Sequence, residues 1–331
     1  MAELYRIFGA EMSPYSVKVR SYFRYKAIPH QWISRNAESQ AEFEKYARMP
    51  IVPLVVTPQG VGIQDSTPII DKMEMLYPEP SIHPDGVAGF ISELIEEFGD
   101  EWGNKWMFHY RWTREIDQIC SAGRIARMRL PKASEQEHGA FASQIRARMA
   151  DRVWFVGSNA QTAPQIEAGF KDMLTLLDDH LAGRNYLFGA RPAYGDFGLW
   201  GQFYQLWTDP TSGALIEGGA PHVLNWVHRM LWPRPEGAFE PWPALAPTLM
   251  PILKTQVGEK FMPWTLANEK ALAQGDQEFS VKLGDTDWRQ KPQKYHARSL
   301  SMLRAKYAAV ADKAALNRVL NEAGCLEGLR A

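Results

Sequence analysis

The spacing of apolar residues divides the chain into two regions. In the first 80 residues, short apolar runs alternate with stretches of helical periodicity. The apolar runs predict strands at 4–8, 30–34, 51–57 and 61–64. The periodic stretches predict helices at 17–27, 40–48 and 67–77. The resulting order, β-α-β-α-β-β-α, predicts a small sheet with helices on its faces.

The proline-rich segment YPEPSIHPDG at 77–86 predicts a domain boundary. After it the pattern is helical, with apolar residues at steps of three and four. Such stretches occur at 89–120, 165–181, 196–207 and 222–231, and in the tail at 263–273 and 297–323. The many prolines from 232 to 251 predict a surface loop. We therefore expect a mixed α/β domain over residues 1–80 and an all-helical domain over 86–331, with a C-terminal extension from about 255.

Composition narrows the function classes. The 331 residues include 37 basic and 38 acidic ones, so the net charge of −1 argues against nucleic acid or an anionic membrane as a partner. No apolar run approaches the ~20 residues of a membrane span, and the N-terminus does not read as a secretory signal. Two isolated cysteines, Cys120 and Cys325, make neither a disulfide framework nor a zinc site. We expect no metal and a cytoplasmic location.

The stretch SPYS at residues 13–16 stands between the first predicted strand and the first predicted helix. Ser13 is a favourable N-cap, and Pro14 is favoured at the first helical position. This stretch therefore begins a helix whether or not it takes part in chemistry.

Two further stretches favour a functional interpretation of SPYS over a simple helix start. In Ile51-Val52-Pro53 a cis proline would expose the peptide groups of Val52 to an extended ligand; the alternative is a proline in an edge strand. In QDST at 64–67, Asp65 or Ser66 either caps a helix or binds a ligand. As a binding site, the helix N-terminus and Ser66 would hold a carboxylate and Asp65 an ammonium group.

Together, SPYS, IVP and QDSTPII resemble the glutathione transferase superfamily, over roughly residues 3–250. The resemblance implies a thioredoxin-like N-terminal domain followed by an all-helical C-terminal domain. YLFGARPAYGDFGLWGQF at 186–203 is similar to the buried helix of the family and its capping motif. Asp196 matches that motif, but Ala193 stands where the family has a Ser or Thr cap, a loss of ~1 kcal/mol. The tail resembles an extension found in a longer bacterial branch.

The resemblance implies that the nucleophile is the thiolate of glutathione, bound as a co-substrate. Ser13 is similar to the activating serine of the serine-type branches, and its hydroxyl would donate a hydrogen bond to the thiolate. Tyr15 and Ser16 are the alternatives. Neither position 13 nor position 16 is a cysteine, which disfavours thiol–disulfide exchange through a protein sulfur.

The resemblance also implies how glutathione is held. The backbone of Val52 would pair with the cysteinyl part, Pro53 would be cis, and Asp65 and Ser66 would hold the γ-glutamyl end. The family often has a polar or basic residue before its Val-Pro pair, but this chain has Ile51. Arg48 or Lys45 could replace it, with a solvated helix end as the alternative, and the favoured, interpretation of both.

The electrophile is expected between the domains. Tyr15 and the face of 97–112 that carries Trp102, Trp106 and His109 are the candidates for its pocket, with core packing as the alternative for these three. The adjacent acids Asp100 and Glu101 raise the possibility of acid–base chemistry, for which the sequence shows no second motif. We expect the tail segment 278–300 to fold back and narrow the pocket, or to cover the outer face of the second domain.

The sequence thus predicts a transferase in which glutathione attacks a small hydrophobic electrophile. One alternative is a binding or interaction protein of the same fold with no chemistry. A narrower enzymatic alternative is ether cleavage or dehalogenation. The resemblance further implies a homodimer.

Overall fold

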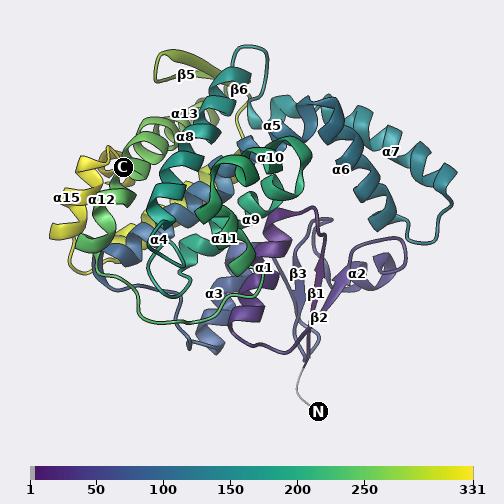
Figure 1. Cartoon of the computed structure of the whole chain (residues 1–331), viewed down its shortest axis with the longest axis horizontal. Helices are drawn as coiled ribbons and strands as arrows, with labels where there is room; N and C mark the ends of the chain where they lie inside the picture. Colours follow the sequence, from purple (N-terminus) through teal and green to yellow (C-terminus); the bar gives the residue numbers. More distant parts are fainter. Residues whose placement is uncertain (1–3, 331) are drawn as a thin grey trace.

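A four-stranded sheet forms the N-terminal part of the molecule (Figure 1). The computed structural model describes residues 4–330 and orders the strands β2-β1-β3-β4. β1 is parallel to β2 and antiparallel to β3, which pairs antiparallel with β4. All four predicted strands are present. Their bounds are β1 Tyr5–Gly9, β2 His30–Ser34, β3 Leu54–Val56 and β4 Gly62–Gln64.

Helices cover both faces of this sheet. α1 (Pro14–Tyr25) and α3 (Ser66–Leu76) lie on one face, and α2 (Gln40–Tyr46) lies on the other. Successive residues of a strand point to opposite faces, so Ile7 enters the main core while Phe8 packs in a smaller cluster with the α2 side chains. The apolar runs that predicted the strands are thus explained by two buried faces.

The rest of the described chain is helical apart from one β-hairpin (Figure 1). The helical segments before the tail are α4 Gly86–Phe98, η1 Gly99–Gly103, α5 Asn104–Thr113, α6 Glu115–Arg129, α7 Glu135–Ala150, η2 Val153–Val156, α8 Ala163–Leu181, α9 Tyr194–Thr208, α10 Pro210–Gly219 and α11 Pro221–Arg229. The tail follows with α12 Trp242–Ile252, η3 Leu253–Phe261, α13 Met262–Gln274, β5 Phe279–Leu283, β6 Thr286–Gln290, α14 Lys294–Ala309, α15 Ala314–Glu322 and α16 Leu326–Arg330.

The buried helix α9 is the centre of this helical part. Its Asp196 is fully buried and accepts hydrogen bonds from the backbone of Leu187 and Ala193 and from the indole of Trp226, at 2.8, 2.9 and 2.9 Å. Burial raises the pKa of Asp196 to about 7. Ala193 supplies no side-chain cap, as the sequence implied, but Asp196 still satisfies the backbone N–H of Ala193.

A single helical run crosses α9 and faces the sheet domain. It continues from α4 through η1, a π-helical turn, into α5. A Cβ atom on Gly99 would lie 2.6 Å from the backbone nitrogen of Leu199, so only glycine permits this close crossing. The π-helical turn changes which residues of the run face the sheet domain.

The tail corrects two sequence expectations. The proline-rich segment up to 251 is not all loop, because α12 occupies its second half. Pro243 lies in the first turn, where a missing N–H costs nothing, and burial of Leu245 and Leu249 holds the helix. The hairpin β5–β6 was not predicted. Its outward residues are polar, and its inward ones, including Trp288, are buried.

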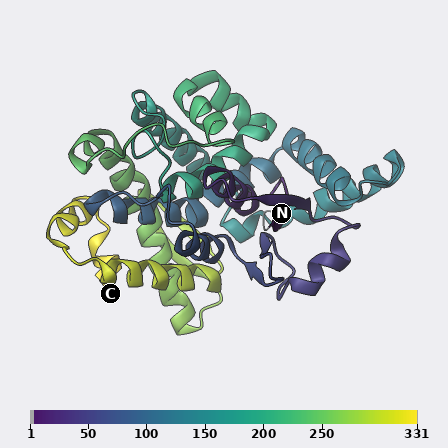
Figure 2. The same cartoon turned by 90° about the horizontal axis from the view of Figure 1, so that it is seen from below.

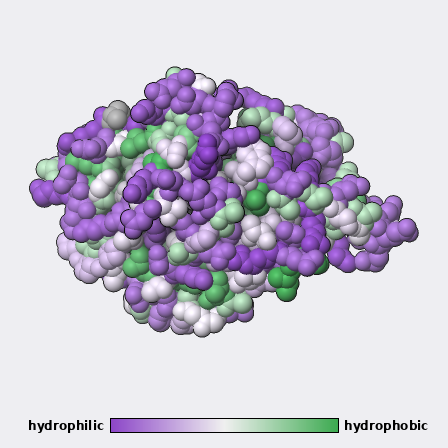
Figure 3. All heavy atoms as spheres, turned by 90° about the horizontal axis from the view of Figure 1, so that it is seen from above, coloured by the Kyte–Doolittle hydropathy of each residue, from purple (hydrophilic) through white to green (hydrophobic). Residues whose placement is uncertain are grey.

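The last helices pack along α4, so the tail is part of the main core (Figures 1 and 2). Leu300, Leu303 and Leu316 are buried there. The face in Figure 3 is mostly hydrophilic, with small scattered hydrophobic patches. Among residues 4–330, no helix is both long and apolar enough to cross a membrane.

Candidate functional site

A cavity of about 380 Å³ collects residues from each of the three sequence stretches and from the tail. Its volume is in the range of small-molecule sites. The first domain contributes Tyr15, Ile51, Val52, Pro53 and Asp65, η1 to η2 contribute Glu101, Asn104 and Phe155, and the tail contributes Gln293, Tyr295 and His296.

Ser13 caps α1. Its backbone is extended, and its Oγ accepts a hydrogen bond from the Ser16 backbone N–H at 3.3 Å. A hydroxyl has one proton to donate and lone pairs to accept with, so this cap leaves the Ser13 proton available to a ligand. Ser13 is half-buried and does not itself line the 380 Å³ cavity, whereas Tyr15, in the same first turn, does.

The two alternatives to Ser13 are less suited to donate. Tyr15 already donates its hydroxyl proton to the Asp100 carbonyl at 3.1 Å. The side-chain amide of Asn104 donates to the Tyr15 hydroxyl oxygen at 3.5 Å. Burial and the nearby Glu101 and Asp100 carboxylates raise the pKa of Tyr15. Ser16 is fully buried, and its Oγ has no hydrogen-bond partner within the described chain.

One glutamine side chain, that of Gln64, binds the backbone of the segment before β3. The Gln64 side-chain oxygen accepts from the backbone of Arg48 and Met49, and its nitrogen donates to the carbonyls of Met49 and Ile51. The Val52-Pro53 bond is cis, as the resemblance implied. No backbone hydrogen bond of Val52 occurs within residues 4–330, so its peptide groups can pair with an extended ligand.

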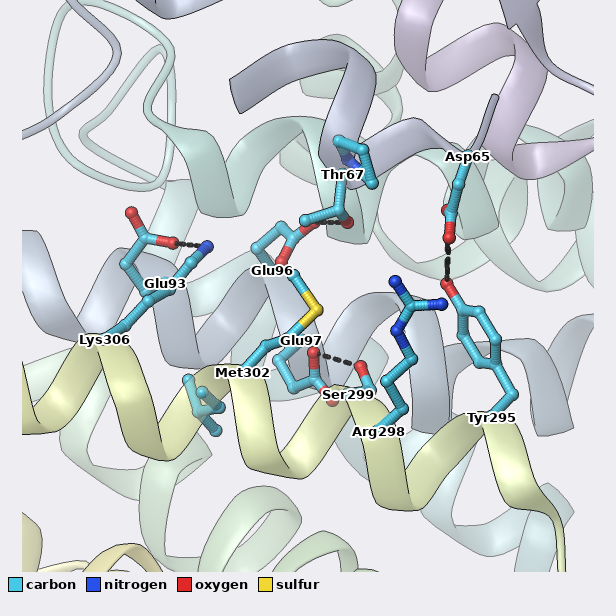
Figure 4. A pocket seen from close by; sticks show the side chains of 12 residues that line it. Asp65, Thr67, Glu93, Glu96, Glu97, Tyr295, Arg298, Ser299, Met302 and Lys306 are labelled. Atoms are coloured by element: carbon cyan, nitrogen blue, oxygen red, sulfur yellow. Dashed lines mark hydrogen bonds and ion pairs between the residues drawn. The ribbon is translucent and has the colours of Figure 1, made fainter. Parts of the chain in front are cut away.

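Asp65 has a positive φ of 78°, which is uncommon for a residue with a side chain. Its carboxylate accepts hydrogen bonds from the Tyr295 hydroxyl, at 3.2 Å to one oxygen and 3.1 Å to the other (Figure 4). The carboxylate that the sequence assigned to a ligand ammonium group thus already has a partner from the tail.

Ser66 begins α3, directly after Asp65. It is 1% exposed, and its Oγ has no hydrogen-bond partner within the described chain. Neither Asp65 nor Ser66 forms a side-chain cap, which argues against the capping interpretation of QDST. An unpaired buried hydroxyl at a helix N-terminus is suited to bind an anionic group.

Ile51 is 43% exposed at the rim and carries no charge for a ligand carboxylate. Basic groups lie in an adjoining hollow of about 320 Å³, which shares Asp65 with the main cavity. Arg48 comes from the segment before β3, and Arg298 comes from α14.

Three interactions fasten α14 to the first domain and to α4 (Figure 4). Besides Tyr295 to Asp65, Ser299 donates to Glu97 at 2.6 Å and Lys306 pairs with Glu93 at 2.6 Å. The small hollow between them, about 30 Å³, has room for roughly one water molecule. The position of Tyr295 is therefore fixed both by its hydrogen bond to Asp65 and by the contacts that attach α14 to α4.

A buried acid–histidine pair completes the cavity. Glu101 of η1 and Nδ1 of His296 are hydrogen-bonded, and both side chains line the cavity. Burial raises the pKa of Glu101 to about 8, against the opposing charge of Lys105, while burial and Lys105 lower the pKa of His296. The sequence flagged Glu101 without a partner; the partner lies 195 residues further along the chain.

Lys105 is fully buried beside this pair. Its Nζ lies 3.7 Å from the Trp264 ring centroid, with Trp102 and Trp288 at 5.4 and 5.7 Å. No hydrogen-bond partner of Nζ occurs within the described chain. Burial lowers the pKa of Lys105 to about 7, partly offset by Glu101.

Three residues predicted for the electrophile pocket do not line the cavity. Trp102 packs between Trp264 and Trp288, at 5.7 and 5.4 Å between ring centroids, and Trp106 lies in the main core. His109 is buried and bonded to Ser158 and Glu167. Trp102, Trp106 and His109 share one helical face, but that face points toward the tail and α8.

The cavity wall is instead formed by a neighbouring face of the same helical run, η1–α5, and by the tail. Glu101 and Asn104 precede and follow the predicted tryptophan by one and two positions. Gln293, Tyr295 and His296 belong to the tail segment that was expected to fold back, and the first form of that expectation agrees with their positions. No local signal marks Asn104 or Phe155.

Among residues 4–330, no group of three or more His, Cys, Asp or Glu side chains is arranged to hold a metal ion. Some charged residues near the cavity form ion pairs with one another. Lys18, for example, lies 2.7 Å from Asp100 and also contacts Glu96.

Comparison with known families gives two matches. Residues 7–81 match the model of the glutathione S-transferase N-terminal domain, and residues 143–229 match that of the glutathione S-transferase C-terminal domain. No curated protein sequence matches the chain.

Solved structures of low identity are also similar. A glutathione S-transferase from Rhodospirillum rubrum F11 is 18% identical over 67% of this chain and 86% of its own, with a TM-score of 0.42. One from Methylobacterium radiotolerans JCM 2831, in complex with glutathione sulfonate, is 18% identical over 74% and 94%, with a TM-score of 0.39. A beta-etherase from Sphingobium sp. strain SYK-6 is 16% identical over 70% and 95%, with a TM-score of 0.47. The two domain models, rather than these scores, carry the family assignment.

Proposed function

Because the chain belongs to the glutathione transferase superfamily, we propose that it binds glutathione and activates its thiol for attack on a small hydrophobic electrophile. One observation carries the proposal. Residues from SPYS, IVP and QDST, which lie up to 50 positions apart, line a single cavity of about 380 Å³. Glutathione is the co-substrate, and the protein supplies no sulfur of its own to the reaction.

Ser13 is the proposed activating group. Its lone pair caps α1 and its proton is free to donate to the thiolate, so both functions are compatible. The positive end of the α1 dipole adds to the stabilisation of the anion. Tyr15, whose proton is committed to Asp100, instead contributes its ring to the cavity wall.

The tripeptide is proposed to lie along the first domain. The free peptide groups of Val52, next to the cis Pro53, would pair with the cysteinyl part. Asp65 and the unpaired Ser66 hydroxyl would hold the γ-glutamyl end. Arg48, in the adjoining hollow, is the proposed partner for a carboxylate that Ile51 cannot bind.

The electrophile would occupy the remaining part of the cavity. Tyr15, Phe155 and Tyr295 supply aromatic surface there, and Asn104 supplies an amide. These residues replace Trp102, Trp106 and His109 as the proposed contacts.

A second candidate, a binding or interaction protein of the same fold with no chemistry, is favoured by one observation. Tyr295 occupies the Asp65 carboxylate, so glutathione must displace or share that hydrogen bond. We also keep the cytoplasmic location and the homodimer as predictions, to be tested by fractionation and by light scattering.

A thiolate titration separates the two candidates. Protein is mixed with glutathione, and ultraviolet thiolate absorbance is followed against pH. The transferase should lower the thiol pKa by at least about one unit, equivalent to ~1.4 kcal/mol. Ser13→Gly should abolish this shift while costing the α1 cap only a few tenths of a kcal/mol.

Ser16→Ala is the matched control, because Ser16 lies in the same turn but is buried without a partner. It should leave the thiol pKa shift intact. Binding of glutathione with no shift in the wild type would favour the non-catalytic candidate. Absence of binding at millimolar glutathione would contradict the transferase and leave the binding or interaction protein as the better candidate.

A further inference from the structure

We propose that Glu101 and His296 act as a proton-donating pair, which protonates an oxygen atom of the electrophile as the glutathione sulfur attacks. Glu101 is the proposed catalytic acid, and His296 is its positioning residue. This inference rests on the proposed function and names the class of electrophile that the site would favour.

The first support is the location of the pair. Both side chains line the cavity that Val52, Pro53 and Asp65 share. Glu101 is 2% exposed and His296 is 7% exposed, so bulk water has little access to either. Their hydrogen bond joins η1 to α14, so the acid lies in the wall of the cavity that the tripeptide is proposed to share.

The second support is the way the chain positions Glu101. The carboxylate belongs to the π-helical turn between α4 and α5, and such single turns occur frequently at functional sites. The ring of His296 packs edge-on against Trp264 at 4.7 Å between centroids. A fixed ring that bonds one carboxyl oxygen leaves the other to carry a proton toward the cavity.

The surroundings keep this proton on Glu101 near neutral pH. Burial raises the pKa of the Glu101 carboxyl to about 8, although Lys105 opposes the shift. The other titratable or charged groups around Glu101 come from five parts of the chain. They are Tyr15 and Lys18 of α1, Asp65 before α3, Glu96 and Glu97 of α4, Asp100 of η1, and Tyr295 and His296 of α14.

The proposed step is an attack of sulfur on carbon, coupled to transfer of the Glu101 proton to oxygen. The thiolate sulfur forms a bond to a carbon of the electrophile, and a carbon–oxygen bond breaks with its electron pair moving to oxygen. Glu101 gives its proton to that oxygen. An opened epoxide thereby becomes a hydroxyl group on the glutathione conjugate, and the oxygen side of a cleaved ether leaves as an alcohol or phenol. The proton lost when the next glutathione thiol ionises restores Glu101.

The inferred substrate class therefore has oxygen on the reacting carbon, as in an epoxide or an ether. An electrophile that releases halide gains nothing from an acid, because halide leaves without a proton. This contrast makes the proposal testable with two probes, styrene oxide and 1-chloro-2,4-dinitrobenzene, each with the full-length protein and glutathione.

Glu101→Gln should lower kcat on styrene oxide by about 100-fold, the lower end of the range for acid catalysis. The same variant should lower kcat on 1-chloro-2,4-dinitrobenzene much less, because halide leaves without a proton, so the ratio of the epoxide rate to the chloride rate should fall. His296→Asn keeps a donor near the Nδ1 position, so it should lower the epoxide rate less than Glu101→Gln does. In the wild type, kcat on styrene oxide should fall as pH rises through about 8. Glu101→Gln should not show this fall.

Glu97→Gln is the matched control. Glu97 lies one turn earlier, is also buried and also accepts a hydrogen bond from α14, through Ser299, but it does not line the main cavity. It should leave the ratio of the two rates unchanged.

Equal losses on both probes in Glu101→Gln would overturn the proposal and assign Glu101 a structural role. An unchanged epoxide rate would overturn it while leaving the transferase function intact. If the folded wild type turned over neither probe, the proposed function would fail, and the proton-donating pair with it.

Discussion

The two walls of the cavity are held by different kinds of interaction. On the first-domain wall, the key contacts are local: Ser13 bonds Ser16, and Gln64 holds the segment from Arg48 to Ile51. On the tail wall, Tyr295 and His296 bond partners 230 and 195 residues away. The first wall can therefore be recognised from short motifs, whereas the second exists only when the tail has folded.

The difference also separates chemistry from packing. The first wall presents peptide groups and hydroxyls without partners in the described chain, whose loss should alter ligand binding more than folding. The tail wall depends on buried apolar surface behind it, so its loss should first affect stability. Substitutions on each side can test this division.

The largest expected effect is on the tail side. Trp288→Ala should lower the free energy of unfolding by about 3–5 kcal/mol, because the side chain is fully buried against Trp102. Trp154→Ala, at a position 45% exposed, is the control and should cost less than about 1 kcal/mol. Denaturant unfolding measures both. Equal small losses would mean that the tail is not part of the cooperative core.

The next effect is the pH dependence of stability from Glu101. Its pKa rises from an ordinary 4.5 to about 8 on folding, so the native state binds the extra proton, and its stability falls as pH rises through this range. Between pH 5 and 7, the free energy of unfolding of the wild type should fall by about 2 kcal/mol through this group, and Glu101→Gln should lack that fall. The limiting slope for one proton is ~1.4 kcal/mol per pH unit. Lys105, with its pKa lowered to about 7, acts in the opposite sense only at higher pH. Parallel profiles for wild type and variant would contradict this.

The third effect is on the first-domain wall. Asp65→Asn keeps a side chain that tolerates the positive φ and still accepts from Tyr295, but it loses the charge. Glutathione affinity should fall about 10- to 100-fold, since a hydrogen bond to a charged group contributes about 1.5–3 kcal/mol. Calorimetry measures the affinity, and an unchanged melting temperature is expected. An unchanged affinity would remove Asp65 from the site.

The smallest effect joins the two walls and has the opposite sign. Tyr295→Phe frees the Asp65 carboxylate, so glutathione should bind about three- to tenfold more tightly, a gain of about 1 kcal/mol. Tyr307→Phe on the same helix, whose hydroxyl bonds Asn317 away from the cavity, should change nothing. Weaker binding in Tyr295→Phe would mean that the tail hydroxyl assists the ligand instead of competing with it.

The sequence predicted the first domain well because its signals are short-range. Short apolar runs marked the four strands of the first domain, and SPYS marked the start of α1. The sequence did not predict which residues of the helical part line the cavity. Trp102, Trp106 and His109 have the right spacing for one helical face, but spacing cannot say which neighbour that face meets. A π-helical turn has no clear sequence signature, and it lies in the middle of this run.

By itself, the sequence determined the order of strands and helices along the first domain, the family and the absence of a cysteine at positions 13 and 16. These follow from local preferences and from residue identity, which do not depend on distant contacts. The tertiary structure alone decided that Tyr295 would reach Asp65 and that Glu101 would meet His296. Those pairings depend on where burial of Trp288 and the leucines of α14 places the tail, and that is a property of the whole packed core rather than of any stretch of the chain.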